Sequence, residues 1–149
     1  MMKLRNASDV ISKTLSQNDT GQSGAHQDGI LVPKEMEILS FFPALDSSEK
    51  NPRVHLQFID DDNHPWIFAF IYYNNRFFGG TRNEYRLTRM AGFIKSNDLV
   101  AGDELIFGKD DDETRYISYR RANNKPALRD GTLRLSNNWK VISISSRSK

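Results

Sequence analysis

The segment FFGGTRNEYRLTRM, residues 77–90, holds the densest group of planar, hydrogen-bonding side chains in this sequence. Side chains alternate along an extended strand, so a strand here would carry two polar sets on opposite sides. One set is Arg82, Glu84 and Arg86, and the other is Thr81, Asn83 and Tyr85. In the major groove of DNA, arginine matches O6 and N7 of guanine, glutamate accepts from N4 of cytosine, asparagine pairs with adenine, and threonine and tyrosine suit phosphates. These residues therefore indicate a strand that reads base edges, although an exposed hairpin with arginine–glutamate pairs explains them equally well.

The charges of the chain are nearly balanced overall but unevenly distributed. Lysine and arginine together number 21 and acidic residues 19, which gives a net charge of +2. The stretch 76–95 contains one acid, Glu84, and five basic residues: Arg76, Arg82, Arg86, Arg89 and Lys95. Acids gather instead at 60–62 and 109–113. Such a separation suits one face turned towards a polyanion, and ordinary solvated loops would produce it too.

A second polar stretch, SQNDTGQSGAHQDG at residues 16–29, precedes the first expected strand. Its hydroxyls, its amides and the backbone amides beside Gly21 and Gly24 are groups that can bind phosphates, and Gln22 or Gln27 could reach bases. A flexible polar loop has the same composition, so this stretch alone leaves both interpretations open.

These polar segments need a scaffold, and the pattern of the chain predicts a mostly β one. At 149 residues, with 38% hydrophobic and 27% charged residues, the chain is long enough for one domain with a core. Runs rich in β-branched and aromatic residues predict strands at 29–33, 54–59, 66–73, 85–88, 103–107 and 116–121. Helices are expected at 33–43, from Pro33, and at 89–99, and a final hairpin is expected to turn at Asn137 and Asn138. We expect an antiparallel sheet that is closed or nearly closed.

Several kinds of chemistry find no support in the sequence. The chain has no cysteine, no apolar run of membrane-spanning length and no secretory signal, so we expect a cytoplasmic protein without a disulfide framework. Its three histidines are far apart, and nucleophile-elbow and phosphate-loop motifs are missing. The carboxylates of Asp60–Asp62 or Asp110–Glu113 could hold Mg²⁺ in a compact nuclease, but solvated hairpin tips are the simpler interpretation.

Together the polar segments resemble a known family. The patterns NDTG…G-HQ-G…P and YYN-R-FG-TRNE-R-TR, within residues 14–121, are similar to those of the N-terminal effector domain of EcoRII-type restriction endonucleases. The segment 99–107 also resembles plant B3 DNA-binding domains. The resemblance implies a seven-stranded B3-like pseudobarrel with two short helices, which grips the major groove of double-stranded DNA with two arms.

The resemblance also implies which residues contact DNA. The N-terminal arm would contribute Asn18, Asp19, Thr20, Gln22, Ser23, His26 and Gln27. The C-terminal arm would read base edges with Arg82, Asn83, Glu84 and Arg86, supported by Arg76, Thr81, Tyr85 and Arg89. The family's target is 5′-CCWGG, where W is A or T. Where the family motif has lysines flanking TRNE, this chain has Gly80 and Tyr85.

The resemblance further predicts the organisation of the chain. Residues 1–13 would be an N-terminal extension, 14–144 the B3-like domain, and 145–149 a linker towards a nuclease domain. We expect a monomeric specificity domain that binds DNA without cleaving it and needs no cofactor, with Mg²⁺ required only by the nuclease domain. A B3-type transcriptional regulator is the other expectation that the resemblance leaves open.

Overall fold

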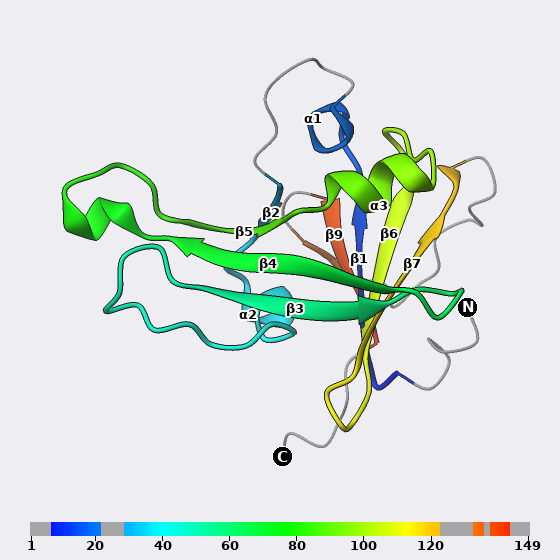
Figure 1. Ribbon diagram of the computed structural model, residues 1–149, viewed down its shortest axis with the longest axis horizontal. Coiled ribbons are helices and arrows are strands. Elements are labelled where there is room, and N and C mark those ends of the chain that lie inside the picture. Colours follow the sequence, from blue (N-terminus) through cyan, green and yellow to red (C-terminus); the bar gives the residue numbers. More distant parts are fainter. Residues whose placement is uncertain (1–6, 22–28, 123–132, 136–137, 144–149) are drawn as a thin grey trace.

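Nine strands form one sheet in the computed structural model, which describes residues 7–21, 29–122, 133–135 and 138–143 (Figure 1). The strand order is β2-β5-β4-β3-β7-β6-β1-β9-β8. Neighbouring strands are antiparallel except β3 and β7, which run parallel where Phe58 pairs with Arg115. The strands are β1 Asp9–Thr14, β2 Ile30–Val32, β3 Arg53–Ile59, β4 Pro65–Tyr73, β5 Glu84–Thr88, β6 Glu104–Lys109, β7 Arg115–Arg120, β8 Leu133–Leu135 and β9 Trp139–Ser143.

The sheet curves around the core, so that β9, near one end of the strand order, contacts β2 at the other end. The indole Nε1 of Trp139, on β9, donates to the carbonyl oxygen of Leu31, on β2, at 3.0 Å. Large apolar side chains fill the space between, including the fully buried Phe58, Phe68, Phe70, Phe93, Phe107 and Trp139. In VHLQF, residues 54–58, apolar and polar residues alternate, which predicts that Val54, Leu56 and Phe58 face one way. On β3, Leu56 and Phe58 are indeed buried, whereas His55 and Gln57 are exposed. The mostly β architecture is therefore confirmed.

The short helices differ in detail from those predicted. Helix α2, Met36–Leu39, begins three residues after Pro33 because the backbone stays extended through its N-cap, Glu35. Helix α3, Ala91–Ser96, begins two residues after Arg89, whose φ of 68° lies outside the helical range. Helix α1, Gln17–Thr20, and a 3₁₀ turn, η2, Asn75–Phe78, were not expected. None of the described helices is long and apolar enough to cross a membrane.

The expected count of seven strands is too low, and the expected domain start at residue 14 cuts through β1. This strand lies inside the sheet, paired with β6 on one side and β9 on the other. Its buried residues include two polar ones, Ser12 and Lys13, so its composition does not predict a central strand.

A buried ionic cluster explains how such a polar strand is accommodated. The carboxylate of Glu104, on β6, accepts from Ser12 Oγ at 2.7 Å and from Arg120 Nη2 at 2.8 Å. Lys140 Nζ, on β9, lies 2.9 Å from the same carboxylate. Burial alone would raise the pKa of Glu104, but hydrogen bonds from Lys140, Ser12 and Arg120 outweigh it and lower the pKa to about 2. The cluster therefore ties four neighbouring strands together through one ionised carboxylate.

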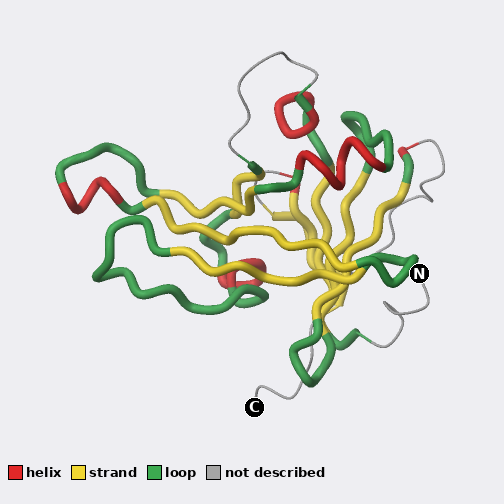
Figure 2. The backbone as a smooth tube through the Cα atoms, viewed as in Figure 1, coloured by secondary structure: helices red, strands yellow, loops and turns green. Residues whose placement is uncertain are grey.

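The ends of β4 and β5 project from the body of the molecule, with η2 at their tip (Figures 1 and 2). We call this projection, residues 72–86, the arm. Helix α1 lies at the top of the same view, and the short strand β2 pairs with β5, whose first residues belong to the arm.

Candidate nucleic-acid interface

One side of the arm carries the three charged residues that the alternation predicts. Glu84 Oε2 accepts from Arg82 Nη2 at 2.7 Å and from Arg86 Nε at 2.8 Å. Arg86 Nη1 also donates to the carbonyl oxygen of Gly29 at 3.2 Å, and the Arg82 guanidinium lies 3.8 Å from the centre of the Tyr73 ring. All three charged side chains stay partly exposed. The predicted set is thus a connected cluster with fixed geometry.

This cluster keeps its carboxylate ionised. Burial would raise the pKa of Glu84, but the hydrogen bonds from Arg82 and Arg86 and the charges of both arginines lower it below its ordinary value. Glu84 therefore remains an acceptor at neutral pH, and its charge offsets part of the two positive charges beside it.

The opposite side of the arm is aromatic and amide-bearing. Tyr85 stacks on Tyr72 at 4.2 Å between ring centres and on the buried Phe70 at 5.6 Å. The Tyr72 hydroxyl donates to Asn83 Oδ1 at 2.7 Å. This bond occupies the oxygen of the Asn83 amide and directs its NH₂ group away from Tyr72. The NH₂ group can then donate to an acceptor on DNA. The two-bond pairing with adenine, which the sequence suggests, is less favoured because it also needs the oxygen.

Asn74, which sequence reasoning missed, holds the arm where β4 leads into η2. This fully buried residue donates from Nδ2 to the carbonyl oxygens of Ser47 and Glu49 at 3.2 and 2.8 Å. Its Oδ1 accepts from the amide of Asn51 at 2.7 Å. The Asn-Asn pair between a strand and two glycines is a turn signal, but it does not indicate that Asn74 is buried.

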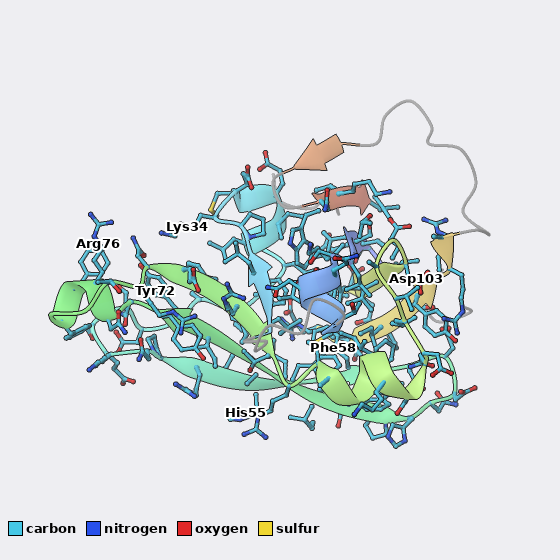
Figure 3. All side chains as sticks on the ribbon, turned by 90° about the horizontal axis from the view of Figure 1, so that it is seen from above. Lys34, His55, Phe58, Tyr72, Arg76 and Asp103 are labelled. Atoms are coloured by element: carbon cyan, nitrogen blue, oxygen red, sulfur yellow. The ribbon has the colours of Figure 1, made fainter. Side chains whose placement is uncertain are left out.

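A groove of about 660 Å³ lies between the arm and the segment that follows β2. Its lining comes from residues 31–35 and from Asn83 and Glu84. Lys34, which is not among the predicted DNA contacts, is exposed here. Figure 3 places Lys34 and Arg76 on one side of the strands and His55 on the other. Asn83 and Glu84 of the arm therefore border this groove, and Lys34 adds a positive charge to its lining.

Three more of the predicted DNA contacts lie before and after β5. Arg76, in η2, and Thr81, three residues after η2, are exposed at the tip of the arm. Arg89 is exposed beyond the far end of β5, with its left-handed backbone. In the described part of the chain, Arg82, Arg86 and Arg89 therefore follow one another along β5 and its ends, and Arg76 lies at the tip.

The N-terminal candidates divide into two groups. Asn18 and Thr20 lie on α1, and Asn18 is exposed. Asp19 is buried: it accepts from the backbone amide of Ser16 at 3.0 Å, in a capping box, and pairs with Lys13 at 3.1 Å. Its carboxylate therefore organises α1 in this structure. Gln22, Ser23, His26 and Gln27 lie outside the described residues.

Gly29, just before β2, lies in close contact with the backbone of β5. Gly29 has a φ of +82°, and a Cβ there would lie 2.5 Å from the carbonyl oxygen of Leu87. Only glycine fits at this contact between the start of β2 and β5.

The acidic segments have turn-forming roles. Asp60 accepts from the backbone amides of Asp62 and His64 and from the Trp66 indole. Burial would raise the pKa of Asp60, but these bonds lower it below its ordinary value. Asp110 accepts in the same way from the amides of Asp112 and Thr114. Across the described ranges, no group of three or more histidine, aspartate or glutamate side chains could hold a metal ion.

The chain is similar to proteins of two kinds. A family model described as "Restriction endonuclease EcoRII, N-terminal" matches residues 6–107. The type II restriction enzyme EcoRII of Escherichia coli is 43% identical over 83 residues, which are 54% of this chain and 20% of that enzyme. Auxin response factor 19 of Oryza sativa subsp. japonica is 30% identical over 126 residues, 85% of this chain and 10% of that protein. The chain therefore spans about a fifth or a tenth of the length of these relatives.

One solved structure extends the similarity to the fold. The protein in the Arabidopsis FUS3–DNA complex superposes with a TM-score of 0.58 at 23% identity, covering 74% of this chain and 95% of that one. At this identity the likeness concerns the fold alone, which agrees with the mostly β architecture described above.

Proposed function

Because this chain belongs to the family of EcoRII N-terminal domains, we propose that it binds double-stranded DNA at a specific sequence, as the target-recognition domain of a restriction endonuclease. The proposed target is a 5′-CCWGG-like site, read in the major groove. The observation that carries this proposal is the Arg82–Glu84–Arg86 cluster, which is internally paired, partly exposed and mounted on a projecting arm.

The arm has a topology and chemistry suited to the major groove. That groove is roughly 12 Å wide and admits a two-stranded β ribbon. At the outer end of the arm, Tyr73 of β4 pairs with Glu84 of β5 beyond the residues that pair with β2. An arginine of the cluster would bind O6 and N7 of a guanine while Glu84 accepts from N4 of the paired cytosine. Since Glu84 holds both arginines before DNA arrives, fewer side-chain rotamers remain to be fixed on binding.

Contacts with phosphates would set the register of the arm. Arg76 at the tip and Arg89 beyond the far end of β5 are both exposed, and Lys34 lies beside the groove. Phosphate contacts supply affinity without sequence information, so these residues would position the arm while the cluster discriminates bases. The N-terminal arm is proposed to contact the same site through the residues that the resemblance implies.

A second candidate function is a B3-type transcriptional regulator. The match to auxin response factor 19 extends over 85% of this chain, a larger share than the match to EcoRII covers. Both candidates use the domain as a DNA reader and differ in what it is joined to. We propose that the domain itself binds without cleaving, because the acids that a compact nuclease would use form hairpin turns.

A gel-shift titration tests the function directly. It compares a CCWGG duplex with one in which a single C·G pair is reversed, first without and then with Mg²⁺. Binding that prefers the CCWGG duplex, with the DNA intact in Mg²⁺, is the expected result. Equal binding to both duplexes would mean that the arm reads another sequence. DNA cut in Mg²⁺, and left intact by an Asp60→Asn or Asp110→Asn variant, would establish a nuclease instead.

A further inference from the structure

The tip of the arm exposes two neighbouring aromatic rings. Phe77 is 65% exposed and Phe78 is 44% exposed, and both belong to η2. Single exposed apolar residues are common on protein surfaces. Two adjacent phenylalanines at the end of a projection are different, because the body of the protein does not cover them there.

The turn that carries these rings is closely held by hydrogen bonds. The Phe77 amide donates to the carbonyl oxygen of Asn74 at 3.0 Å, and the Arg76 amide donates to that of Arg82 at 2.9 Å. Asn75 Oδ1 accepts from the Arg82 amide, and the carbonyl oxygen of Asn75 accepts from the Gly80 amide, both at 2.7 Å. The turn therefore presents Phe77 and Phe78 in a fixed direction.

Close packing and backbone geometry reinforce this turn. A Cβ on Gly80 would lie 2.7 Å from the side chain of Asn75, and Gly79 has a φ of +94°. A residue other than glycine would therefore strain the backbone at position 79 and displace the Asn75 side chain at position 80. A turn with two such constraints has a defined shape, and that shape leaves the two rings outside.

The surroundings of the rings indicate what they meet. Arg76 is their immediate neighbour and exposed, and the Arg82–Glu84–Arg86 cluster follows on the same arm. These cations suit a polyanion, so the partner at the tip must combine negative charge with an apolar group. In the major groove the apolar group on a base edge is the C5 methyl of a pyrimidine.

We propose that Phe77 and Phe78 contact pyrimidine C5-methyl groups in the major groove, so that the tip of the arm adds a methyl-dependent element to target recognition. This inference rests on the proposed DNA-binding function and deepens it. The methyl group has two sources, thymine and 5-methylcytosine, and both present it at the same position of the base.

The experiment removes or adds single methyl groups without changing base pairing. Each thymine of a CCWGG duplex and its flanks is replaced in turn by deoxyuridine, and each cytosine by 5-methylcytosine. Binding of these duplexes is titrated with the unmodified chain and with the Phe77→Ala and Phe78→Ala variants. Ile67→Ala is the matched control, because Ile67 is 49% exposed near the start of β4, away from the tip.

We expect at least one deoxyuridine to weaken binding by roughly fourfold, the factor for one buried methyl group. The same deoxyuridine should have no effect on Phe77→Ala or Phe78→Ala and should keep its effect on Ile67→Ala. If a 5-methylcytosine strengthens binding of the unmodified chain but not of the phenylalanine variants, the inference is supported and 5-methylcytosine is the source of the methyl group. Methyl changes without effect on the unmodified chain, or with equal effect on all variants, would overturn it. If no duplex is bound with any preference, the proposed function itself has failed.

Discussion

The ammonium group of Lys13 lies 3.1 Å from the carboxylate of Asp19, and the two side chains are only 5% and 10% exposed. The contact joins the end of β1 to α1, and Lys13 also donates to the carbonyl oxygen of Thr14. The same Asp19 oxygen accepts from the Ser16 amide. Asp19 was expected among the DNA contacts, and that role stays a prediction. In this structure its carboxylate fixes the helix that leads into the N-terminal arm.

Replacing Lys13 by Met should destabilise the fold. The substitution keeps the length of the side chain but leaves the buried carboxylate of Asp19 without its counter-charge, which costs about 3–5 kcal/mol in comparable pairs. Urea denaturation would measure the loss. Lys34→Met is the matched control, because Lys34 is exposed, and it should change the free energy of unfolding by less than about 0.5 kcal/mol. Equal stability of the two variants would contradict a buried, energetically important pair.

Replacing Arg82 by Ala should reduce discrimination between the CCWGG duplex and its single-pair variants by about 1–3 kcal/mol. Glu84→Gln tests the same cluster with little change of shape, since it removes the charge that both arginines bind. It should also relax specificity, most at a C·G pair. Both effects are measured as ratios of dissociation constants at one salt concentration. If a variant lost affinity equally for every duplex, the replaced side chain would contact phosphates and not base edges.

Replacing Arg76 by Ala should act differently, because an exposed cation at the tip of the arm is expected to contact a phosphate. Binding should weaken for all duplexes by a similar factor. The slope of log K against log salt should become less steep by about 0.9, the value for one lost phosphate contact. Arg76→Lys keeps the charge and should keep most of the slope. A change in base preference with an unchanged slope would assign Arg76 to a base edge.

Asn74 should matter for both stability and specificity. Its side chain is fully buried and bridges the arm to the carbonyl oxygens of Ser47 and Glu49 and to the amide of Asn51. An Asn74→Ala variant leaves these backbone groups without their partner and should lose about 1–3 kcal/mol of unfolding free energy. At temperatures where the variant is still folded, it should discriminate between duplexes less well. Preserved discrimination would show that the arm is held without Asn74.

The parts of this fold that the sequence predicts are those controlled by neighbouring residues. Alternation along the chain correctly assigned the two faces of β3 and placed Arg82, Glu84 and Arg86 on one side of the arm. Strand β1 escaped prediction because its buried Ser12 and Lys13 are satisfied by partners on other elements. A polar residue gives no sign of such a partner in the local sequence.

The same limit applies to the candidate site. Asn74 meets its partners 23–27 residues away, and Tyr72 meets Asn83 across the hairpin. These contacts depend on the path of the loop that contains Ser47 and Asn51 and on the register between β4 and β5. The residue types of the arm predict what it can bind, whereas its rigidity becomes visible only when distant segments are brought together.

Acid should weaken the fold through Glu104. Its pKa is about 2 in the folded protein, against an ordinary value of 4.5, because Lys140, Ser12 and Arg120 bind its ionised form. The ionised form is therefore favoured more in the folded than in the unfolded state, and the difference corresponds to roughly 3 kcal/mol. This stabilisation is fully present above about pH 4.5 and declines as the pH falls towards 2.

A Glu104→Gln variant should be less stable at pH 7 and should lose less stability between pH 5 and 2.5. The exposed Glu49 is the control, and Glu49→Gln should follow the unmodified profile. An acid-induced loss of the same size in Glu104→Gln would mean that other carboxylates carry the pH dependence.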